Sequence, residues 1–457
     1  MSKKSILQKI LGVLARATIR KYQPMIIAVT GSVGKTSTRM AIFAMLKNKF
    51  SVRTAEKNYN NEIGVALAIL GIPHGGRNVL KWAGAIARAA TRVIIRHPDY
   101  PGILVLEYGV DRPGDMDYLL SLAVPDIAVV TAMGDVPAHV EFFENPEEVV
   151  REKAKLVSAL KHEGFAILNH DDYAVYDMKG RTKAHVLTYG QEEHAEIRIV
   201  NYELRTGKDA ELGDIPAGIS FKVDYKGSVV PVRLNDTFGM PQVYAAAAAA
   251  AVGIALKMNP VRSKIAEASA DLFSANRASN GMNLVDISGA LHGYVPPPGR
   301  MRGVKGNKHS FILDDTYNAS PEAMRAALDT LNQLPAKRKI AVLGDMLEIG
   351  KYTEIAHRSI GDKAAQFVDV LVTVGARAKF IADEAMARGL NRTKIFTFDD
   401  ARTAGRALDP MIQAGDLILI KGSQGMRMER VVEEIMAHPE QADRLLVRQE
   451  KYWKITS

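Results

Sequence analysis

A glycine-rich segment near the start of the chain carries the residue types that bind phosphate groups. Residues 31–37 read GSVGKTS, and a lysine and a threonine directly follow the second glycine. Glycines let backbone N–H groups approach an anion, lysine reaches the β- and γ-phosphates of a nucleotide, and a threonine hydroxyl binds Mg²⁺. The expected nucleotide contacts are therefore Gly31, Ser32, Gly34, Lys35, Thr36 and Ser37. An ordinary glycine–serine turn before a helix is the alternative interpretation.

Further polar side chains could complete a site around a bound nucleotide. Glu107 follows the apolar run 103–106, where it could hold Mg²⁺ directly or through water, or bond to the neighbouring backbone instead. His139 is a second candidate metal ligand, although a single histidine is more often a hydrogen-bonded loop residue. Asn60 and Asn61 could present their amides to a substrate or a phosphate, or they could cap a loop.

These residues need a scaffold that brings the ends of several strands together. Short apolar runs rich in β-branched residues predict buried strands, and they alternate with helical patterns. The alternation favours an α/β fold with doubly wound sheets, which collect ligands at the carboxyl ends of their strands. The expected strands are 25–29, 103–106, 127–131 and 164–169 in the first part, and 311–313, 339–343, 368–374, 394–398 and 416–420 in the last part.

A domain boundary is expected at residues 296–299, which read PPPG. Prolines stiffen such a linker and the glycine gives it a pivot. Before it, residues 24–297 are expected to form a central nucleotide-binding domain, with a small antiparallel sheet at about 185–235. After it, residues 298–457 are expected to form a Rossmann-like domain, and residues 1–23 a basic amphipathic helix.

Composition narrows the classes of function. The chain has 457 residues, a net charge of +9 and no cysteine, which excludes disulfides, thiolate metal sites and a cysteine nucleophile. A basic balance suits anionic substrates, a membrane surface or nucleic acid, but no basic segment with interleaved aromatic residues indicates a nucleic-acid partner. Residues 2–21 and 79–96 both combine apolar residues at helical spacing with positive charge. Helix 2–21 either packs on the edge of the domain or lies on an anionic membrane surface.

Nine segments, taken in order, resemble the Mur ligases, and most closely the MurF type that adds D-alanyl-D-alanine. The resemblance runs from about residue 24 to residue 435, and no single segment carries it alone. The segments are TGSVGKTST (30–38), NYNNEIGVALAIL (58–70), LEYGVDRPGDM (106–116), AHVEFFENPEEVVREKAKL (138–156), LNHDD (168–172), GRMRG (299–303), DDTYNASPEAM (314–324), LGDMLEIG (343–350) and LIKGSQGMRME (419–429).

The resemblance implies an ATP-dependent amide ligase. Such an enzyme forms an acyl phosphate on a carboxylate and then joins the acyl group to an amine. ATP and Mg²⁺ are the implied cofactors, a peptide-bearing muramoyl precursor is the implied acceptor, and D-alanyl-D-alanine is the implied amine. The implied protein is a cytoplasmic monomer of peptidoglycan synthesis, at the inner face of the membrane if helix 2–21 binds lipid.

The resemblance also assigns roles to single residues. By analogy, Thr36 and Glu107 hold a first Mg²⁺, and His139 together with a carbamylated Lys155 holds a second. The remaining roles fall on Arg300 at the ATP phosphates, Asp315 at the ribose, Asn318 and Ser320 at the incoming amine, and Lys421 at a substrate carboxylate or phosphate. A solvated charge at a strand end is the alternative for Lys421.

The sequence departs from the family pattern in three places. Only about 24 residues precede the phosphate loop, where MurF-type enzymes usually carry a domain that binds the UDP end of the acceptor. The asparagine expected near adenine is Ala245, so either Gln242 is a substitute or the nucleotide preference is relaxed. The arginine expected after KGS is Gln424, with Arg427 as a candidate replacement.

Two other functions therefore stay open. One is the same chemistry on a different acceptor, such as a lipid-linked precursor, a folate-type glutamate chain or another peptide-like substrate. The other is a nucleotide-binding regulator without ligase activity. A motor or GTPase is disfavoured, because the chain shows no separate acidic Walker-B run and no base-specifying motif.

Overall fold

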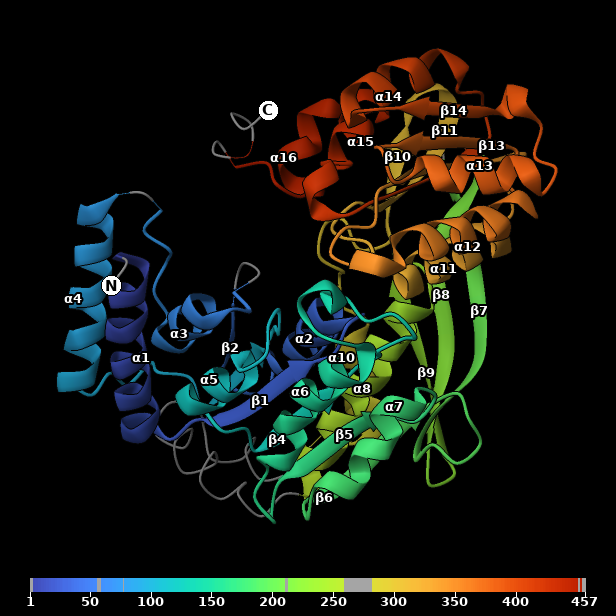
Figure 1. Cartoon of the computed structure of the whole chain (residues 1–457). Coiled ribbons are helices and arrows are strands. Elements are labelled where there is room, and N and C mark those ends of the chain that lie inside the picture. Colours follow the sequence, from blue (N-terminus) through green and yellow to red (C-terminus); the bar gives the residue numbers. More distant parts are fainter. Residues whose placement is uncertain are drawn as a thin grey trace.

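The computed structural model describes residues 3–55, 59–76, 78–209, 213–258, 282–450 and 453. It holds a nine-stranded sheet in the N-terminal part and a six-stranded sheet in the C-terminal part, each flanked by helices (Figure 1). The α/β class predicted from the sequence is therefore confirmed. Asn58 and the first two residues of the chain lie outside the described residues.

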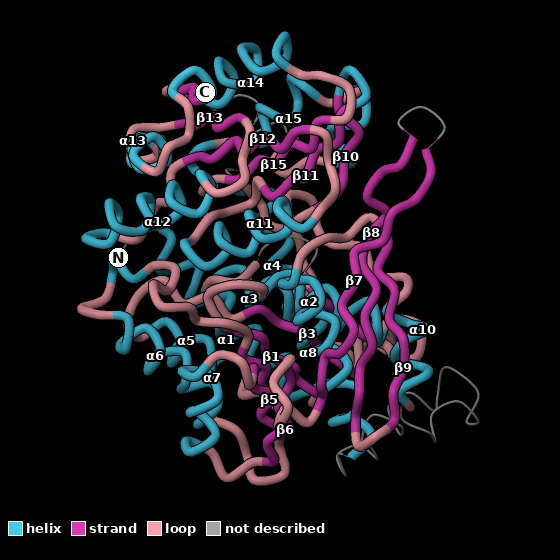
Figure 2. The backbone as a smooth tube through the Cα atoms, turned by 90° about the vertical axis from the view of Figure 1, so that its right-hand side faces the viewer, coloured by secondary structure: helices cyan, strands magenta, loops and turns pink. Residues whose placement is uncertain are grey.

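The first sheet has the strand order β2-β3-β1-β4-β5-β6-β7-β8-β9. Its strands are β1 (Met25–Thr30), β2 (Val52–Thr54), β3 (Ile103–Glu107), β4 (Ile127–Val130), β5 (Phe165–Asn169), β6 (His185–Gly190), β7 (Ile197–Asp209), β8 (Gly213–Tyr225) and β9 (Ser228–Asn235). The part from β2 to β6 is parallel, and β7–β9 are antiparallel. Because β6 pairs with both β5 and β7, the antiparallel strands extend the main sheet rather than forming a separate one (Figure 2).

The helices of the N-terminal part cover both faces of this sheet. They are α1 (Lys3–Tyr22), α2 (Lys35–Leu46), α3 (Glu62–Leu70), α4 (Val79–Ile94), α5 (Asp115–Leu122), α6 (Pro146–Ser158), α7 (Tyr173–Tyr176), α8 (Met240–Met258) and α10 (Leu284–Leu291). The alanines at 245–251 are all buried, and small side chains let α8 pack closely against α2 and the sheet. Among the described residues, α8 is the one helix long and apolar enough to cross a membrane, but 78% of that stretch is buried inside the protein.

The C-terminal part is a second doubly wound unit with the strand order β10-β11-β15-β12-β13-β14. Its strands are β10 (Arg302–Gly306), β11 (Ser310–Asp315), β12 (Arg338–Gly344), β13 (Val370–Val374), β14 (Ile395–Phe398) and β15 (Asp416–Lys421). Its helices are α11 (Pro321–Gln333), α12 (Thr353–Ala365), α13 (Lys379–Ala387), α14 (Ala401–Leu408), α15 (Glu429–Ile435) and α16 (Ala442–Leu445). The proline-rich segment 296–299 lies between α10 and β10, the first strand of this sheet.

The sheet register places the first polar residues side by side. Strands β1 and β3 are adjacent and parallel, and Val29 is the register partner of Glu107. Every residue of both strands is buried, so apolar contacts on both faces fix this alignment. The glycine-rich loop after β1 and the carboxylate at the end of β3 therefore meet at one edge of the sheet.

Candidate active site

The glycine-rich loop has the backbone that a phosphate cradle needs. Gly31 and Gly34 have φ angles of 139° and 88°, which favour glycine. A side chain on Gly31 would overlap the hydroxyl of Thr131 on the neighbouring segment. The Lys35 ammonium group folds back and donates to the carbonyl oxygens of Gly31 at 2.8 Å and Ser32 at 3.3 Å. The loop is thus closed around its own lysine at the N-terminus of α2, where the helix dipole favours an anion.

Thr36 and Glu107 are brought together, as the sequence predicts. The Thr36 hydroxyl donates to Glu107 Oε1 at 3.2 Å, and the Asn60 amide donates to the same oxygen at 3.3 Å. The other carboxylate oxygen, Oε2, lies 3.3 Å from Nε of Arg39. Both Thr36 and Glu107 are buried. A hydroxyl and a carboxylate are the hard oxygen donors that Mg²⁺ accepts when phosphate oxygens and water fill its other positions, so these residues fit the ion.

His139, which was predicted to hold a second Mg²⁺, contacts residues other than Thr36 and Glu107. The His139 ring lies 2.9 Å from the carboxylate of Glu348 and 3.4 Å from that of Asp111. His139 holds the pKa of Glu348 below its ordinary value. Within the described ranges, no three histidine, aspartate or glutamate side chains converge as metal ligands. His139 joins the end of the central sheet to the loop after β12 in the C-terminal part, and its role as a metal ligand stays a prediction.

The lysine of helix α6 that contacts the phosphate loop is Lys153, and not Lys155, which the sequence analysis selected. Lys155 is 39% exposed and forms ion pairs with Asp117 at 2.6 Å and Glu152 at 2.7 Å. Lys153 is 1% exposed, and its ammonium group donates to the Ser32 hydroxyl at 3.0 Å. Residues two apart on a helix point about 200° apart, so both lysines cannot face the loop. The prediction for Lys155 is corrected accordingly, and Lys153 is a site residue that the sequence analysis missed.

Lys153 and Lys35 share one buried, positively charged environment. Burial and the nearby Lys35 hold the pKa of Lys153 well below its usual value. Burial also lowers the pKa of Lys35, while Glu107 raises it and Arg300 lowers it again. The positive charges of Lys35 and Arg300 at this loop suit a polyanionic ligand, because phosphate groups would supply the missing negative charge.

Arg300 reaches the phosphate loop from the C-terminal side of the linker. Its guanidinium group stacks on the Tyr317 ring at 4.0 Å, and Nη2 lies 3.5 Å from the Thr36 hydroxyl. The Arg300 Nε atom is buried without a hydrogen-bond partner. A buried donor without an acceptor is costly, and a phosphate oxygen would satisfy it. The predicted position of Arg300 beside the phosphates thus has a geometric basis.

Asp315 and Lys421 are paired with each other rather than pointing at a nucleotide. The Lys421 ammonium group donates to Asp315 at 2.6 Å and to the Asn318 carbonyl oxygen at 2.9 Å, and it is 1% exposed. The second Asp315 oxygen accepts from the Met301 N–H at 3.1 Å. Both oxygens of Asp315 thus hold neighbouring protein groups, and the ribose contact predicted for Asp315 stays a prediction. The solvated alternative for Lys421 is wrong.

Three predicted substrate contacts have structural partners in this fold. The Asn61 side chain caps α3 by accepting from the Gly64 N–H at 2.9 Å, so the loop-capping alternative applies to it. The Ser320 hydroxyl caps α11 in the same way, accepting from the Ala323 N–H at 3.5 Å. The Asn318 amide oxygen accepts from the Gln424 N–H at 3.3 Å. Contacts of these residues with a substrate stay predictions.

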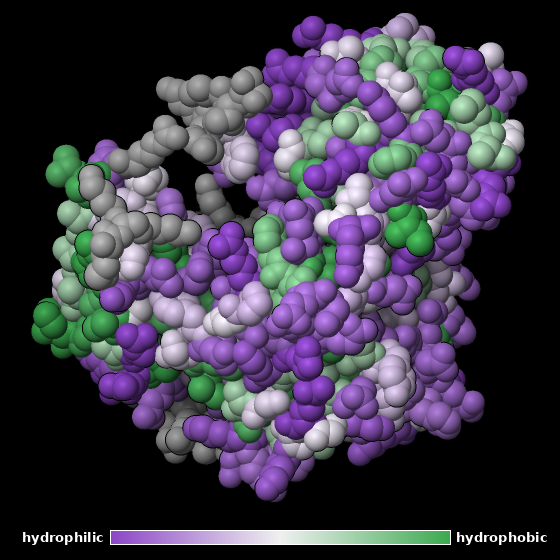
Figure 3. All heavy atoms as spheres, in the orientation of Figure 1, coloured by the Kyte–Doolittle hydropathy of each residue, from purple (hydrophilic) through white to green (hydrophobic). Residues whose placement is uncertain are grey.

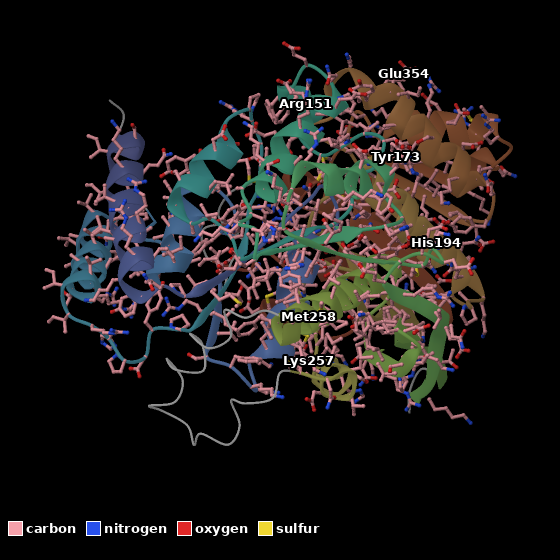
Figure 4. All side chains as sticks on the ribbon, turned by 90° about the horizontal axis from the view of Figure 1, so that it is seen from below. Arg151, Tyr173, His194, Lys257, Met258 and Glu354 are labelled. Atoms are coloured by element: carbon pink, nitrogen blue, oxygen red, sulfur yellow. The ribbon has the colours of Figure 1, made fainter. Side chains whose placement is uncertain are left out.

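A cavity of about 960 Å³ lies beside the phosphate loop and is lined by both parts of the chain. Gly34, Thr38, Tyr244 and Asp171 are among the residues that line it. Arg151 of α6 and Tyr173 of α7, both labelled in Figure 4, also line it. Ligand sites of this kind commonly measure 300–1,000 Å³, so a nucleotide base and sugar would fit.

The residue expected to replace the adenine-binding asparagine does not reach this cavity. Gln242 is 2% exposed and donates to Ser37 Oγ at 3.2 Å and to the Arg300 carbonyl at 3.0 Å. Its amide oxygen accepts from the Tyr294 hydroxyl at 2.7 Å. The prediction for Gln242 is therefore corrected, and its amide instead ties α2 to the linker region. Tyr244 faces the cavity and donates a hydrogen bond to Asp171.

A buried arginine near the C-terminal end organises the loop after β11. Arg448 Nη1 donates to the Thr316 carbonyl at 3.2 Å and to Glu429 at 2.7 Å, and Nη2 donates to the Tyr317 carbonyl. Arg427, the candidate replacement after KGS, also pairs with Glu429, at 2.6 Å. Arg427 therefore belongs to the ion-pair network around Glu429 and does not occupy the position of Gln424.

We expect Arg448→Met to weaken use of the amine substrate about tenfold or more, because it frees the backbone that carries Asn318. The readout is the KM for the amine measured separately from kcat, since a purely structural loss would lower both the amount of folded protein and the apparent kcat without raising KM. Arg448→Lys keeps the charge beside Glu429 and is the matched conservative variant. A KM for the amine that is unchanged in Arg448→Met would contradict the positioning role.

Comparison with known proteins places this architecture in a family context. Residues 93–253 match the family model described as the Mur ligase middle domain, and residues 299–424 match the Mur ligase, glutamate ligase domain. A UDP-N-acetylmuramoyl-tripeptide–D-alanyl-D-alanine ligase of Bacillus subtilis is 27% identical over 93% of this chain and 79% of its own length. The crystal structure of MurF from Acinetobacter baumannii has a TM-score of 0.71 at 24% identity, covering 93% of this chain and 79% of that chain. MurF from Thermotoga maritima in complex with ADP has a TM-score of 0.69 at 23% identity, covering 93% and 83%.

Proposed function

Because the chain belongs to the Mur ligase superfamily, we propose that it is an ATP-dependent carbon–nitrogen ligase of the MurF type, which joins D-alanyl-D-alanine to a muramoyl-tripeptide precursor of peptidoglycan. The similarity to the Bacillus subtilis ligase extends over 93% of the chain. A cytoplasmic location and a monomeric state accompany this proposal, as does a peripheral membrane contact through residues 2–21.

The observation that carries the proposal is the convergence of three side chains from separate elements on one loop, two of which, Lys35 and Arg300, are cationic. Lys35 closes the loop, Lys153 donates to its Ser32, and Arg300 approaches Thr36 from across the linker. Transfer of a phosphoryl group to a carboxylate brings two anions together, and fixed positive groups offset their repulsion. Mg²⁺ held by Thr36 and Glu107 would supply further neutralisation at the same phosphates.

The proposed ligation has two steps, acyl phosphate formation and amide formation. The acceptor carboxylate attacks the γ-phosphorus of ATP, the bond to the β-phosphate oxygen breaks, and ADP leaves an acyl phosphate behind. The amine then attacks the acyl carbon, and phosphate leaves as the amide forms and the ammonium proton is lost. Arg300 and Tyr317 come from the C-terminal part, so approach of that part to the loop both completes the cationic set and excludes water from the acyl phosphate.

The test is ADP release by the purified protein with Mg-ATP, UDP-muramoyl-tripeptide and D-alanyl-D-alanine, with the mass of the product measured alongside. We expect turnover to require both substrates and to yield the joined pentapeptide. ADP release without the joined product would show acyl phosphate formation with a different natural amine. No turnover with this acceptor would contradict the MurF-type assignment, and lipid-linked acceptors would be tried next.

A further inference from the structure

Helices α1 and α4 form the outermost layer on the flank of the molecule opposite β7–β9 (Figure 1). Their C-terminal ends are tied together, because the Lys21 ammonium group donates to the Val93 carbonyl at 2.8 Å and the Tyr22 hydroxyl donates to the Arg92 carbonyl at 3.0 Å. Tyr22 also stacks on Tyr100 at 4.1 Å. The two helices therefore act as one surface unit.

Helix α4 is apolar on its outward side as well as its inward side. Only Ala85 and Ala89 of this helix are buried, and they face the protein. Leu80 and Ile94 lie on the opposite side and are 82% and 80% exposed. The residues between them on that side, at helical spacing, are Ala83, Gly84, Ala87 and Thr91. A helix at a water-facing surface normally carries charged and polar residues there, so this face is unusual for a solvated helix.

Helix α1 extends the same apolar surface. Its inward stripe, with Leu11 and Ala15, is buried, so it packs on the domain edge as one of the two interpretations of the sequence predicts. A second stripe, consisting of Ile6, Ile10 and Val13, is 40–58% exposed. In Figure 3 hydrophobic atoms gather on this flank of the molecule. Contiguous exposed apolar surface of this kind marks an interaction site more often than scattered single residues do.

The charges on these two helices have one sign. Neither α1 nor α4 contains an aspartate or glutamate. Lys81 and Arg88 are exposed along one side of the outward stripe of α4, and Arg20 is exposed on α1. In the described part of the chain, none of these three cations forms an ion pair with an acidic residue. An apolar stripe bordered only by cations complements a surface that is anionic outside and apolar beneath.

We propose that this face docks peripherally on the surface of an anionic lipid bilayer. The docking face consists of Ile6, Ile10, Val13, Val79, Leu80, Lys81, Arg88, Ile94 and Ile95. The apolar side chains enter the boundary between headgroups and acyl chains, and the cations contact lipid phosphates. Four of the seven apolar side chains, Val79, Leu80, Ile94 and Ile95, belong to α4 or its C-cap, so this inference goes beyond a contact through residues 2–21 alone.

Charge also argues against a second copy of the chain as the occupant. Two copies facing each other through α1 and α4 would oppose like charges, with no acidic residue on either helix to offset them. The docking face includes none of the residues placed at the phosphate loop or the inter-domain cavity. Its test is therefore independent of the ligase assay, and either proposal can fail without the other.

The experiment is flotation of the full chain with vesicles of phosphatidylcholine mixed with phosphatidylglycerol, and with vesicles of phosphatidylcholine alone. We expect the chain to float with the mixed vesicles, to stay behind with phosphatidylcholine, and to dissociate as salt is raised. The double variants Leu80→Gln/Ile94→Gln and Lys81→Gln/Arg88→Gln should each lower the bound fraction about tenfold. Ile355→Gln is the matched control, because Ile355 is 69% exposed on α12, outside the docking face.

Thermal unfolding of each variant keeps loss of fold separate from loss of binding. All substituted side chains are exposed, so melting temperatures should stay close to that of the parent chain. Failure to float with the anionic vesicles, or equal binding by the parent and both double variants, would overturn the proposal. A dimer detected by light scattering and dissociated by Leu80→Gln/Ile94→Gln would overturn it in favour of self-association.

Discussion

Replacing Lys35 with alanine is expected to lower the rate of ATP-dependent ligation by about three orders of magnitude. The Lys35 ammonium group donates to the carbonyl oxygens of Gly31 and Ser32, so it holds the loop closed. It is also half-buried at the N-terminus of α2, where a phosphate would replace those carbonyls as its partner. Alanine removes both the loop contact and the charge that meets the transferring phosphoryl group.

The measurement is ADP release and product mass at saturating ATP and both other substrates. Lys47→Ala is the matched control, because Lys47 is exposed just after the other end of the same helix. We expect Lys47→Ala to retain full turnover, and both variants to keep the parent melting temperature within a few degrees. Unchanged ADP release in Lys35→Ala would separate the loop from catalysis, and a nucleotide-binding protein without ligase activity would then be favoured.

Features that depend on short stretches of chain were predictable from the sequence. The apolar run at 25–29 and the glycines at 31 and 34 predicted a strand, a loop and a helix, and the structure has β1, the loop and α2 there. The strand that ends at Glu107 and the parallel arrangement together predicted that this carboxylate would face Thr36. These predictions succeed because hydrophobic periodicity, turn-forming residues and strand direction are properties of short stretches of the chain.

Features that depend on pairing across the chain were not predictable in the same way. Asp315 and Lys421 are 106 residues apart, and each was given a separate ligand, although the parallel pairing of β11 with β15 makes them register partners. The sequence analysis offers Gln242 as the residue at the adenine base. In α8, however, the Gln242 side chain contacts Ser37, and Tyr244 faces the cavity. A sequence pattern states which residue types are present, whereas the rotation of a buried helix depends on everything packed around it.

The sequence of α6 contains a pattern that distinguishes Lys153 from Lys155. Val149 and Leu156 are apolar positions of one face of α6, and Lys153 lies four residues after the first and three before the second. That spacing places Lys153 on the buried side of the helix, and the structure buries all three. Two charged neighbours, Glu152 and Lys155, obscured the pattern, because a lysine is seldom buried without a functional reason.

Lys153 is therefore the lysine whose loss should disable the site, and we propose that it, rather than Lys155, is the carbamylated residue. A buried ammonium group with no carboxylate partner in the described part of the chain is expensive, and Lys153 is held only by the Ser32 hydroxyl. Addition of CO₂ to the neutral amine forms an N–C bond and releases one proton, which converts the side chain into an anion. An anion there would face Lys35 and could act as a ligand of the second metal ion that the family resemblance implies.

We expect Lys153→Ala to lower kcat by about 10²–10³-fold, the range for loss of one charged group that acts on the transition state. A short carboxylic acid such as acetate, added in solution, should restore part of the activity to this variant because it can occupy the space of the carbamate. Lys155→Ala is the matched control. Its pair with Asp117 is exposed, and the buried Glu152 keeps the N–H groups of Gly114 and Met116 as partners, so turnover should stay within about twofold of the parent chain.

Labelling with ¹³CO₂ distinguishes the two lysines directly. A carbamate carbon signal should appear in the spectrum of the parent chain and of Lys155→Ala, and should be absent from Lys153→Ala. The reverse pattern, with the signal lost and turnover abolished only in Lys155→Ala, would return the carbamate to Lys155 and would require α6 to rotate by about half a turn relative to the phosphate loop. Because Lys153 contacts Ser32, such a rotation would also break the link between α6 and the loop, so the labelling result tests the orientation of the helix together with its chemistry.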